Sequence, residues 1–173
     1  QVNAILKDQD GFLWFGTISG LNRYDGYSYR VFRKNYNDSS TLLDNSVELL
    51  YELPDGKMWV VTGGGVCIYD SHTEKFNSDY YSYLQFLGLP SGPISNIVKG
   101  NNGRYWFIYN NFDVYLYSSK DKKAKSYSQY LNINKFGRIT SVVETNDDKL
   151  WMVYENDIFP RIFKIEVDKA MIK

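Results

Sequence analysis

The chain is poor in cysteine, histidine and net charge. Its 173 residues include one cysteine, Cys67, and one histidine, His72. A single cysteine cannot form an internal disulfide, so the chain is not a disulfide-stapled scaffold, and a single histidine excludes the usual multi-histidine zinc sites. Twenty basic residues balance twenty acidic ones, which removes the long-range attraction that nucleic acids and anionic membranes provide. We therefore expect no nucleic-acid or membrane contact by this segment, and no metal or other cofactor.

Long apolar runs are also missing. No stretch approaches the roughly 18 apolar residues of a membrane span, and the first residues lack the basic-then-apolar pattern of a signal peptide. Because the chain begins in the middle of a repeat, at Gln1 and Val2, we expect it to be an excised or processed segment. The missing targeting signals therefore carry little weight.

Aromatic residues, in contrast, are abundant. The chain has 16 tyrosines and 10 phenylalanines, and 43% of its residues are hydrophobic. This content is ample for a sizeable core. Aromatic side chains favour half-buried, pleated surfaces, so the composition predicts a β-rich, folded protein.

The dominant pattern is an internal repeat marked by tryptophan. The separations are 45, 47 and 45 residues between Trp14, Trp59, Trp106 and Trp151. A turn-forming pair precedes each tryptophan: Asp10-Gly11, Asp55-Gly56, Asn102-Gly103 and Asp147-Asp148. Asp-Gly and Asn-Gly pairs form hairpins because both residues tolerate positive φ. We interpret the tryptophans as a structural core that wedges between repeats.

Each repeat contains four predicted strands. Apolar residues stand both eight and nine positions before each tryptophan, which indicates a strand buried on both faces, since neighbouring residues of a strand point to opposite sides. Four strands in a repeat of about 46 residues is the pattern of a propeller blade. We predict an all-β fold in which residues 1–173 form one propeller segment, an arc of a larger propeller. Its four-stranded antiparallel blades are expected at about 1–36, 44–80, 92–130 and 137–173, and the last blade is incomplete. The connectors between blades, including 78–93, are expected to be irregular.

The first repeat resembles a known family. Residues 5–17, ILKDQDGFLWFGT, and 20–27, GLNRYDGY, are similar to the two-component regulator propeller repeat. The resemblance is close over residues 2–33, clear over 47–76 and weaker afterwards, where Tyr109 and Tyr154 follow the tryptophan strand and Asp148 replaces the turn glycine.

The resemblance implies a segment of a periplasmic sensor in a Bacteroides-type hybrid two-component system. It implies recognition of oligosaccharides and control of polysaccharide utilisation genes, with the histidine kinase outside this chain and no enzyme within it. Two alternatives stay open: a protein-protein interaction propeller, and a polysaccharide lyase or hydrolase, for which no acid-base pair is evident. Exposed blade edges also predict that the isolated segment either self-associates through its ends or closes loosely as a four-bladed ring.

The family motif marks blade structure and transfers no binding residues, so candidate contacts come from geometry. Loops between second and third strands share one rim of a propeller with the connectors between blades. Sugars are bound by aromatic faces together with amide and carboxylate side chains, and only the last two repeats offer this mixture in these loops. The predicted ligand-binding residues are Tyr109, Asn110, Asp113, Glu155 and Asn156.

Three other motifs favour ordinary structure. Asp8-x-Asp10-Gly11 lacks the end ligands of a calcium loop. Cys67 and His72 lie on a strand and in a turn, too far apart for a nucleophile pair. The basic run Lys120, Lys122, Lys123 and Lys125 is interpreted as a solvated hairpin tip.

Overall fold

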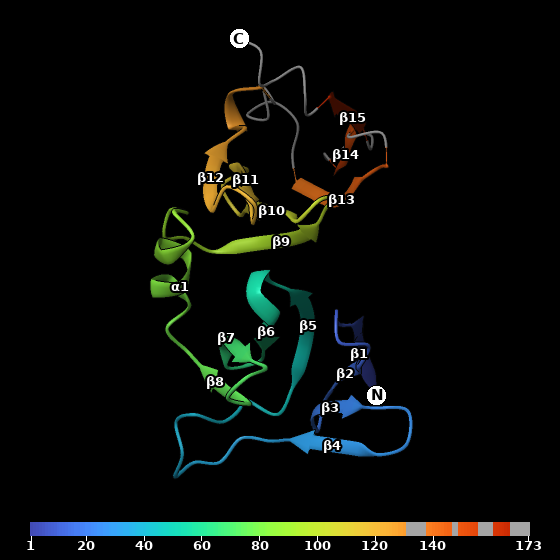
Figure 1. Cartoon of the computed structure of the whole chain (residues 1–173), viewed down its shortest axis with the longest axis vertical. Coiled ribbons are helices and arrows are strands. Elements are labelled where there is room, and N and C mark those ends of the chain that lie inside the picture. The colour runs from blue at the N-terminus through green and yellow to red at the C-terminus, as the bar shows by residue number, and fades with distance from the viewer. Residues whose placement is uncertain (131–137, 147–148, 156–160, 167–173) are drawn as a thin grey trace. The chain divides into compact units, whose positions relative to one another are not determined.

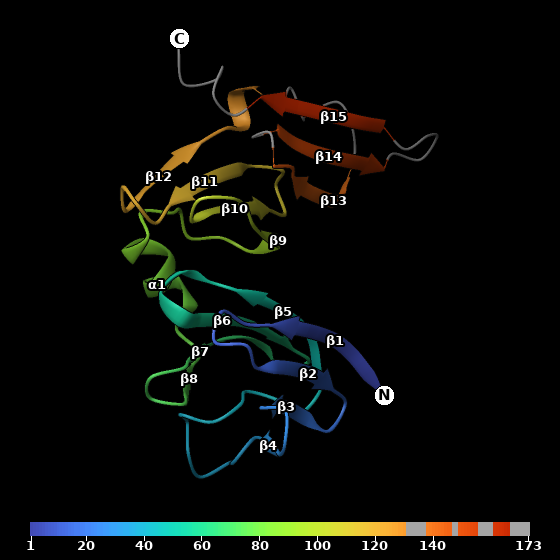
Figure 2. The same cartoon turned by 45° about the vertical axis from the view of Figure 1, so that its right-hand side comes forward.

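The computed structural model describes residues 1–130, 138–146, 149–155 and 161–166, which are mostly strands (Figure 1). The chain divides into two compact units, Gln1–Tyr83 and Leu84–Lys173. Antiparallel sheets with strands in chain order make up both units (Figure 2). The predicted all-β, four-stranded architecture is thereby confirmed.

The first unit contains two four-stranded sheets. The first sheet comprises β1 (Val2–Lys7), β2 (Leu13–Thr17), β3 (Gly20–Tyr24) and β4 (Tyr29–Phe32). The second comprises β5 (Val47–Glu52), β6 (Lys57–Thr62), β7 (Gly65–Asp70) and β8 (Lys75–Asn77), with the 3-10 turn η1 (Pro54–Gly56) between β5 and β6.

The second unit contains the other two sheets. The third sheet comprises β9 (Ile94–Lys99), β10 (Arg104–Tyr109), β11 (Val114–Ser118) and β12 (Lys123–Ser126), followed by the 3-10 turn η2 (Ser128–Tyr130). The fourth comprises β13 (Arg138–Glu144), β14 (Lys149–Glu155) and β15 (Arg161–Glu166). A fourth strand for this sheet would fall in 167–173, outside the described residues.

One connector differs from the prediction. The segment expected to be irregular, 78–93, contains the helix α1 (Tyr80–Phe86). Asp79 caps its first turn, because its carboxylate accepts hydrogen bonds from the backbone N–H (3.1 Å) and the hydroxyl (2.6 Å) of Ser82. Tyr80 packs edge-on against Trp59, with ring centroids 5.1 Å apart. The aromatic cluster of this connector thus partly covers the second sheet.

The turn pairs behave largely as predicted. Asp55 and Asn102 adopt positive φ of 60° and 55°, as do the glycines that follow them. In the first repeat only Gly11 does so. There the Asp8 carboxylate organises the turn by accepting the backbone N–H groups of Asp10 and Phe12 at 3.0 and 2.9 Å. Asp147 and Asp148 lie outside the described residues.

Three of the four repeat tryptophans are fully buried. Trp14, Trp59 and Trp106 are no more than 1% exposed, whereas Trp151 is 38% exposed. Trp14 joins a core shared by the first two sheets, with its ring centroid 5.7 Å from Phe32 and 5.0 Å from Tyr69. The wedge role predicted for these residues is therefore visible for Trp14.

A carboxylate accepts the indole N–H of two of these tryptophans, but from different places. Trp14 donates to Asp8 at 2.6 Å within its own sheet, whereas Trp106 donates to Glu144 of the fourth sheet at 2.5 Å. The repeat counterpart of Asp8 is Gly100. A Cβ at Gly100 would lie 2.0 Å from Glu144 Oε2, so the neighbouring sheet's carboxylate fills the space that a side chain at position 100 would need.

Both faces of β1 were expected to be buried, and this prediction is wrong for one face. Ile5, Phe15, Asn22 and Val31 are paired across the sheet, and Ile5 is 66% exposed. The opposite face, which carries Trp14 and Leu21, packs on the second sheet. The physical reason is that a single neighbouring sheet covers one face only.

The first two sheets approach closely at Gly16. An added Cβ there would lie 2.7 Å from Val47 Cγ1, although Val61 and Ile108 occupy the corresponding place in later repeats. We expect Gly16→Ala to lower the free energy of unfolding by about 1–3 kcal/mol, the usual cost of overpacking. Gly63→Ala, whose Cβ would have 3.5 Å to its nearest neighbour, is the matched control. Urea denaturation followed by circular dichroism compares them, and equal effects would contradict the close approach.

Cys67 lies in the same core. Burial raises the pKa of its thiol from about 9.0 to about 11, partly offset by a backbone hydrogen bond to Leu43. The thiolate is the reactive form, so iodoacetamide should modify the native chain very slowly at mildly alkaline pH and the urea-unfolded chain readily. Because the folded pKa is raised, the stability contribution of the protonated thiol is present below pH about 9 and is lost as the pH rises towards about 11. Equal alkylation of folded and unfolded chains would contradict this.

Within the described part of the chain, no helix is long and apolar enough to cross a membrane. The same residues contain no group of three or more His, Cys, Asp or Glu placed to hold a metal ion.

Candidate functional site

The loops that join second to third strands lie beside the segments that enter each blade. Gly20 N–H donates to Asn45 O, and Gly63 N–H donates to Ser46 O, at 2.8 and 2.9 Å. In the third sheet, Asn110 N–H donates to Pro93 O at 3.0 Å. In each of these three sheets, the loop between the second and third strands therefore lies against a segment that enters a blade, and we call this local contact the rim of the sheet.

The end of the second strand differs between the third sheet and the first two sheets at one repeat position. Thr17 and Thr62 each donate a hydroxyl hydrogen bond to a nearby glycine carbonyl at 2.8 Å. At the same repeat position stands Tyr109, whose hydroxyl donates instead to Pro90 O at 2.7 Å. The larger side chain therefore ties the rim loop to the connector that follows α1.

Tyr109 is a buried residue rather than an exposed platform. It is 4% exposed, and its ring packs edge-on against Tyr115 at 5.4 Å. Desolvation, followed by the nearby Tyr115 and Asp113, raises the pKa of its hydroxyl well above the usual range. Gly92 lies against the ring, since a Cβ there would be 3.2 Å from Tyr109 Cδ1. This environment gives Tyr109 the means to fix the loop.

The loop beyond Tyr109 presents amide and carboxylate groups. Phe112 adopts a positive φ of 69°, and its N–H donates to Tyr109 O at 2.9 Å. Asn111 Nδ2 donates to Asp113 Oδ2 at 2.9 Å. Asn110 is exposed and Asp113 is half-buried, so both lie where a solute could reach them.

The remaining two candidates belong to the fourth repeat. Glu155 is the last residue of β14, on the fourth sheet, and Asn156 lies outside the described residues. Thus three of the five predicted residues, Tyr109, Asn110 and Asp113, belong to one compact loop. Their contact with a ligand stays a prediction.

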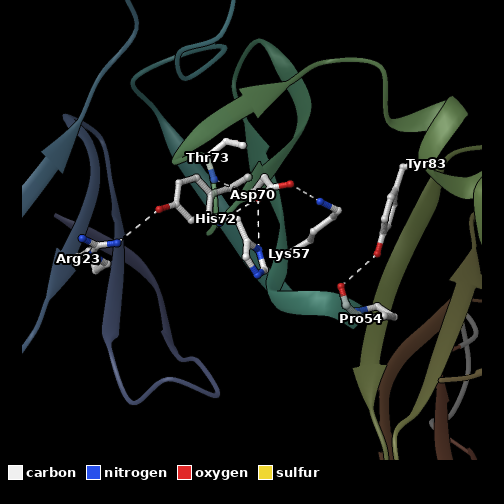
Figure 3. Close-up of polar contacts among 8 residues, drawn as sticks. Arg23, Pro54, Lys57, Asp70, His72, Thr73 and Tyr83 are labelled. Atoms are coloured by element: carbon white, nitrogen blue, oxygen red, sulfur yellow. Dashed lines mark hydrogen bonds and ion pairs between the residues drawn. The ribbon is translucent and has the colours of Figure 1, made fainter. Parts of the chain in front are cut away.

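Two concavities are lined by residues other than the predicted ligand-binding ones. One, of about 410 Å³, lies beside β6, β7 and β8 of the second sheet and includes Lys57, Asp70, Ser82 and Tyr83 in its lining. The polar groups of its lining already have partners (Figure 3). Lys57 forms an ion pair with Asp70, and the Asp70 carboxylate also accepts the backbone N–H groups of His72 and Thr73. The Tyr83 hydroxyl donates to Pro54 O at 3.4 Å. The hydrogen bond from Lys57 contributes most to lowering the pKa of the Asp70 carboxyl below its usual value.

The other concavity, of about 570 Å³, belongs to the third sheet. Its lining includes Lys120, Lys123 and Lys125 from the basic run, together with Arg104 at the start of β10. The predicted solvated hairpin tip is confirmed, since these lysines are exposed around the β11–β12 turn; the shared concavity is an additional feature that the sequence interpretation does not include. The signal was present, because Lys123 and Lys125 are two residues apart on a strand and so point to one face.

Comparison with known proteins finds a family match at the start of the chain. Residues 1–19 match the family described as two component regulator propeller. Over 38 residues, or 22% of this chain, the sequence is 42% identical to histidine kinase P4 of Formosa agariphila. The matched stretch covers only 3% of that kinase.

Solved structures show a similar fold over nearly the whole chain. The extracellular domain of a B. thetaiotaomicron protein assigned as a hybrid two component system has a TM-score of 0.53 at 17% identity, over 98% of this chain and 25% of that one. PorZ, a surface component of the type-IX secretion system of Porphyromonas gingivalis, has a TM-score of 0.54 at 14% identity, over 99% of this chain and 25% of that one. YCF48 bound to D1 peptide has a TM-score of 0.54 at 11% identity, over 89% of this chain and 48% of that one. Residues 1–19 thus match the two component regulator propeller repeat, and the chain has the fold of part of a propeller domain.

Proposed function

We propose that this chain is part of the extracytoplasmic sensor region of a hybrid two-component system, and that it acts by binding an oligosaccharide rather than by catalysis. The observation that carries the proposal is the two component regulator propeller match over residues 1–19. The 38-residue similarity to a histidine kinase and the fold shared with an extracellular domain support it. The kinase lies outside this chain, and the periplasm is the proposed location.

The rim loop of the third sheet is the proposed contact. Asn110 and Asp113 offer the amide and carboxylate groups that pair with sugar hydroxyls. Tyr109 is assigned a positioning role, because its buried hydroxyl holds the loop against Pro90. Tyr109→Phe should therefore weaken binding while leaving the sheet folded.

Calorimetric titration of the complete extracellular region against a panel of oligosaccharides, guided by a glycan array, tests this function. Binding that is weakened by Asn110→Ala and Asp113→Ala, but not by Asp10→Ala in an exposed turn of the first sheet, is the expected result. No binding to any oligosaccharide, together with a stable complex with a protein or metabolite, would overturn the proposal.

A second candidate, a protein-interaction propeller, is favoured by the exposed face of the first sheet. This face includes Ile5, Phe15, Tyr29 and Val31, and Phe15 and Tyr29 lie with ring centroids 6.3 Å apart. The repeat counterparts of Val2 and Ile5, Val47 and Leu50, are buried in the core beneath the first sheet. The exposed face therefore has the composition of a surface that another blade covers.

Self-association through this face gives a direct test. We expect the isolated chain to form oligomers, and Ile5→Lys or Val31→Lys to shift it to monomer, because a charge on the face would have to be buried in the contact. Ile18→Lys is the control, since Ile18 is similarly exposed but lies in the β2–β3 loop. Sedimentation velocity over a range of concentrations is the measurement. A wild-type chain that is monomeric throughout would contradict the prediction.

A further inference from the structure

Four cations line one concave surface of the third sheet. Arg104, Lys123 and Lys125 lie on β10 and β12, and Lys120 lies in the turn that joins β11 to β12. Register pairs Arg104 with Ser118 and Ser118 with Lys123, while Leu116 pairs with Lys125. Leu116 also pairs with Trp106. Arg104, Lys123 and Lys125 therefore lie on the sheet face that carries Trp106.

The positive charge of this surface is only partly balanced. Arg104 forms an ion pair with the buried carboxylate of Glu144. The one acidic residue of the lining, Asp121, accepts a hydrogen bond from the Ser118 hydroxyl at 2.8 Å. Across the described residues, the three lysines have no carboxylate within ion-pair distance. An anion in the concavity would relieve their mutual repulsion.

The first sheet shows how the same position is filled when the neighbouring sheet supplies an acid. Arg30, the register counterpart of Lys125, forms an ion pair with Glu74 of the second sheet, and Arg23 lies 3.0 Å from the same carboxylate. In the third sheet, by contrast, none of the described carboxylates forms an ion pair with Lys125, whereas Glu74 pairs with Arg30 in the first.

The shape and the remaining groups suit a sugar. A volume of about 570 Å³ falls within the usual range for small-molecule sites, about 300–1,000 Å³. Asn102 and Ser118 contribute amide and hydroxyl groups for hydrogen bonds with sugar hydroxyls, and Leu116 and Tyr127 form an apolar floor. Lysine ammonium groups form charge-assisted hydrogen bonds with carboxylate and sulfate oxygens.

We propose that this concavity binds an anionic oligosaccharide, with Lys120, Lys123 and Lys125 contacting its carboxylate or sulfate groups. The proposal rests on the oligosaccharide-sensing function above, and it names a site separate from the rim. β10 begins in the concavity at Arg104 and ends at the rim at Tyr109, so the two sites are about 17 Å apart along the strand. Variants at one site can therefore be tested without altering the other.

The experiment is a calorimetric titration of the 173-residue chain with three oligosaccharides of equal length: a galacturonate, a sulfated and a neutral one. Inorganic sulfate alone is a fourth probe. The variant Lys123→Gln/Lys125→Gln removes two charges from the concavity. Lys122→Gln/Lys34→Gln is the matched control, because it removes the same charge from residues outside the lining. Circular dichroism checks that each variant keeps its sheet content.

We expect one of the two anionic sugars to bind. The Lys123→Gln/Lys125→Gln variant should bind it about tenfold or more weakly, because it loses one or two charge-assisted hydrogen bonds. The galacturonate and sulfated arms decide which group is recognised. Equal weakening in both variants, or inorganic sulfate binding as tightly as the sugar, would overturn the proposed site. Binding of the neutral sugar alone would overturn the anionic ligand while leaving oligosaccharide sensing intact. Binding of no sugar would instead count against both proposals.

Discussion

Replacing Glu144 by alanine is expected to lower the free energy of unfolding of the second unit by about 3–5 kcal/mol, the cost of breaking a buried ion pair by removing one partner. The Glu144 side chain is 0% exposed. Its carboxylate pairs with the Arg104 guanidinium and accepts the Trp106 indole N–H at 2.5 Å and the Asn101 backbone N–H at 3.3 Å. Alanine would leave these donors without their acceptor. Urea denaturation followed by circular dichroism gives the change.

A second substitution makes this prediction sharper. Gly100→Asp alone should destabilise, because its Cβ would lie 2.0 Å from Glu144 Oε2. Combined with Glu144→Ala, the same aspartate should restore part of the lost stability, since it provides a carboxylate from the position that Asp8 uses to bind Trp14. Glu48→Ala, at an exposed position of β5, serves as the control and should change the stability by no more than about 0.5 kcal/mol. Additive losses in the double variant would show that Glu144 does not replace the missing repeat carboxylate.

Trp14→Ala is expected to cost a similar amount, about 3–5 kcal/mol in the free energy of unfolding of the first unit. The indole fills the core between the first two sheets, stacks on Phe32 and donates to Asp8. Its removal would leave a cavity lined by groups that the rest of the sheet holds in place. Hydrogen exchange can assign the loss of protection to residues 1–83.

The repeat provides a control for this variant. Trp151 occupies the same position in the fourth repeat but is 38% exposed, so Trp151→Ala should cost about half as much or less, since less apolar surface leaves water there. If both variants lost the same stability, burial at the repeat tryptophan would not explain its effect.

Much of the fold could be predicted because the regular spacing of the tryptophans aligns the four repeats with one another. The tryptophan offset places the strands, and the Asp-Gly and Asn-Gly pairs place two of the turns. The sequence does not predict the helix α1, because the aromatic residues of this connector are also typical of an apolar cluster in a loop. A local signal existed: Asp79 at a capping position, and buried Leu84 and Leu87 at helical spacing.

The candidate site was less predictable for a physical reason. The residue types at the rim are readable from sequence, and Asn110 and Asp113 do lie near its surface. Whether a tyrosine lies exposed or buried depends on a partner distant in sequence, here Pro90 for Tyr109. Glu144 is a similar case, since its role follows from the absence of a side chain at Gly100, 44 residues earlier in the chain.

The hydrogen bonds of the Trp14 and Trp106 indoles also imply an order in which the sheets can fold while the chain is being synthesised. The acceptor of Trp14 precedes it by 6 residues, whereas the acceptor of Trp106 follows it by 38. A nascent chain leaving the ribosome can therefore complete the first bond as soon as Trp14 emerges. The third sheet must wait until Glu144 has been translated, and closing that longer loop costs more chain entropy. Translation that pauses between these two residues would prolong the interval in which the third sheet is unfinished.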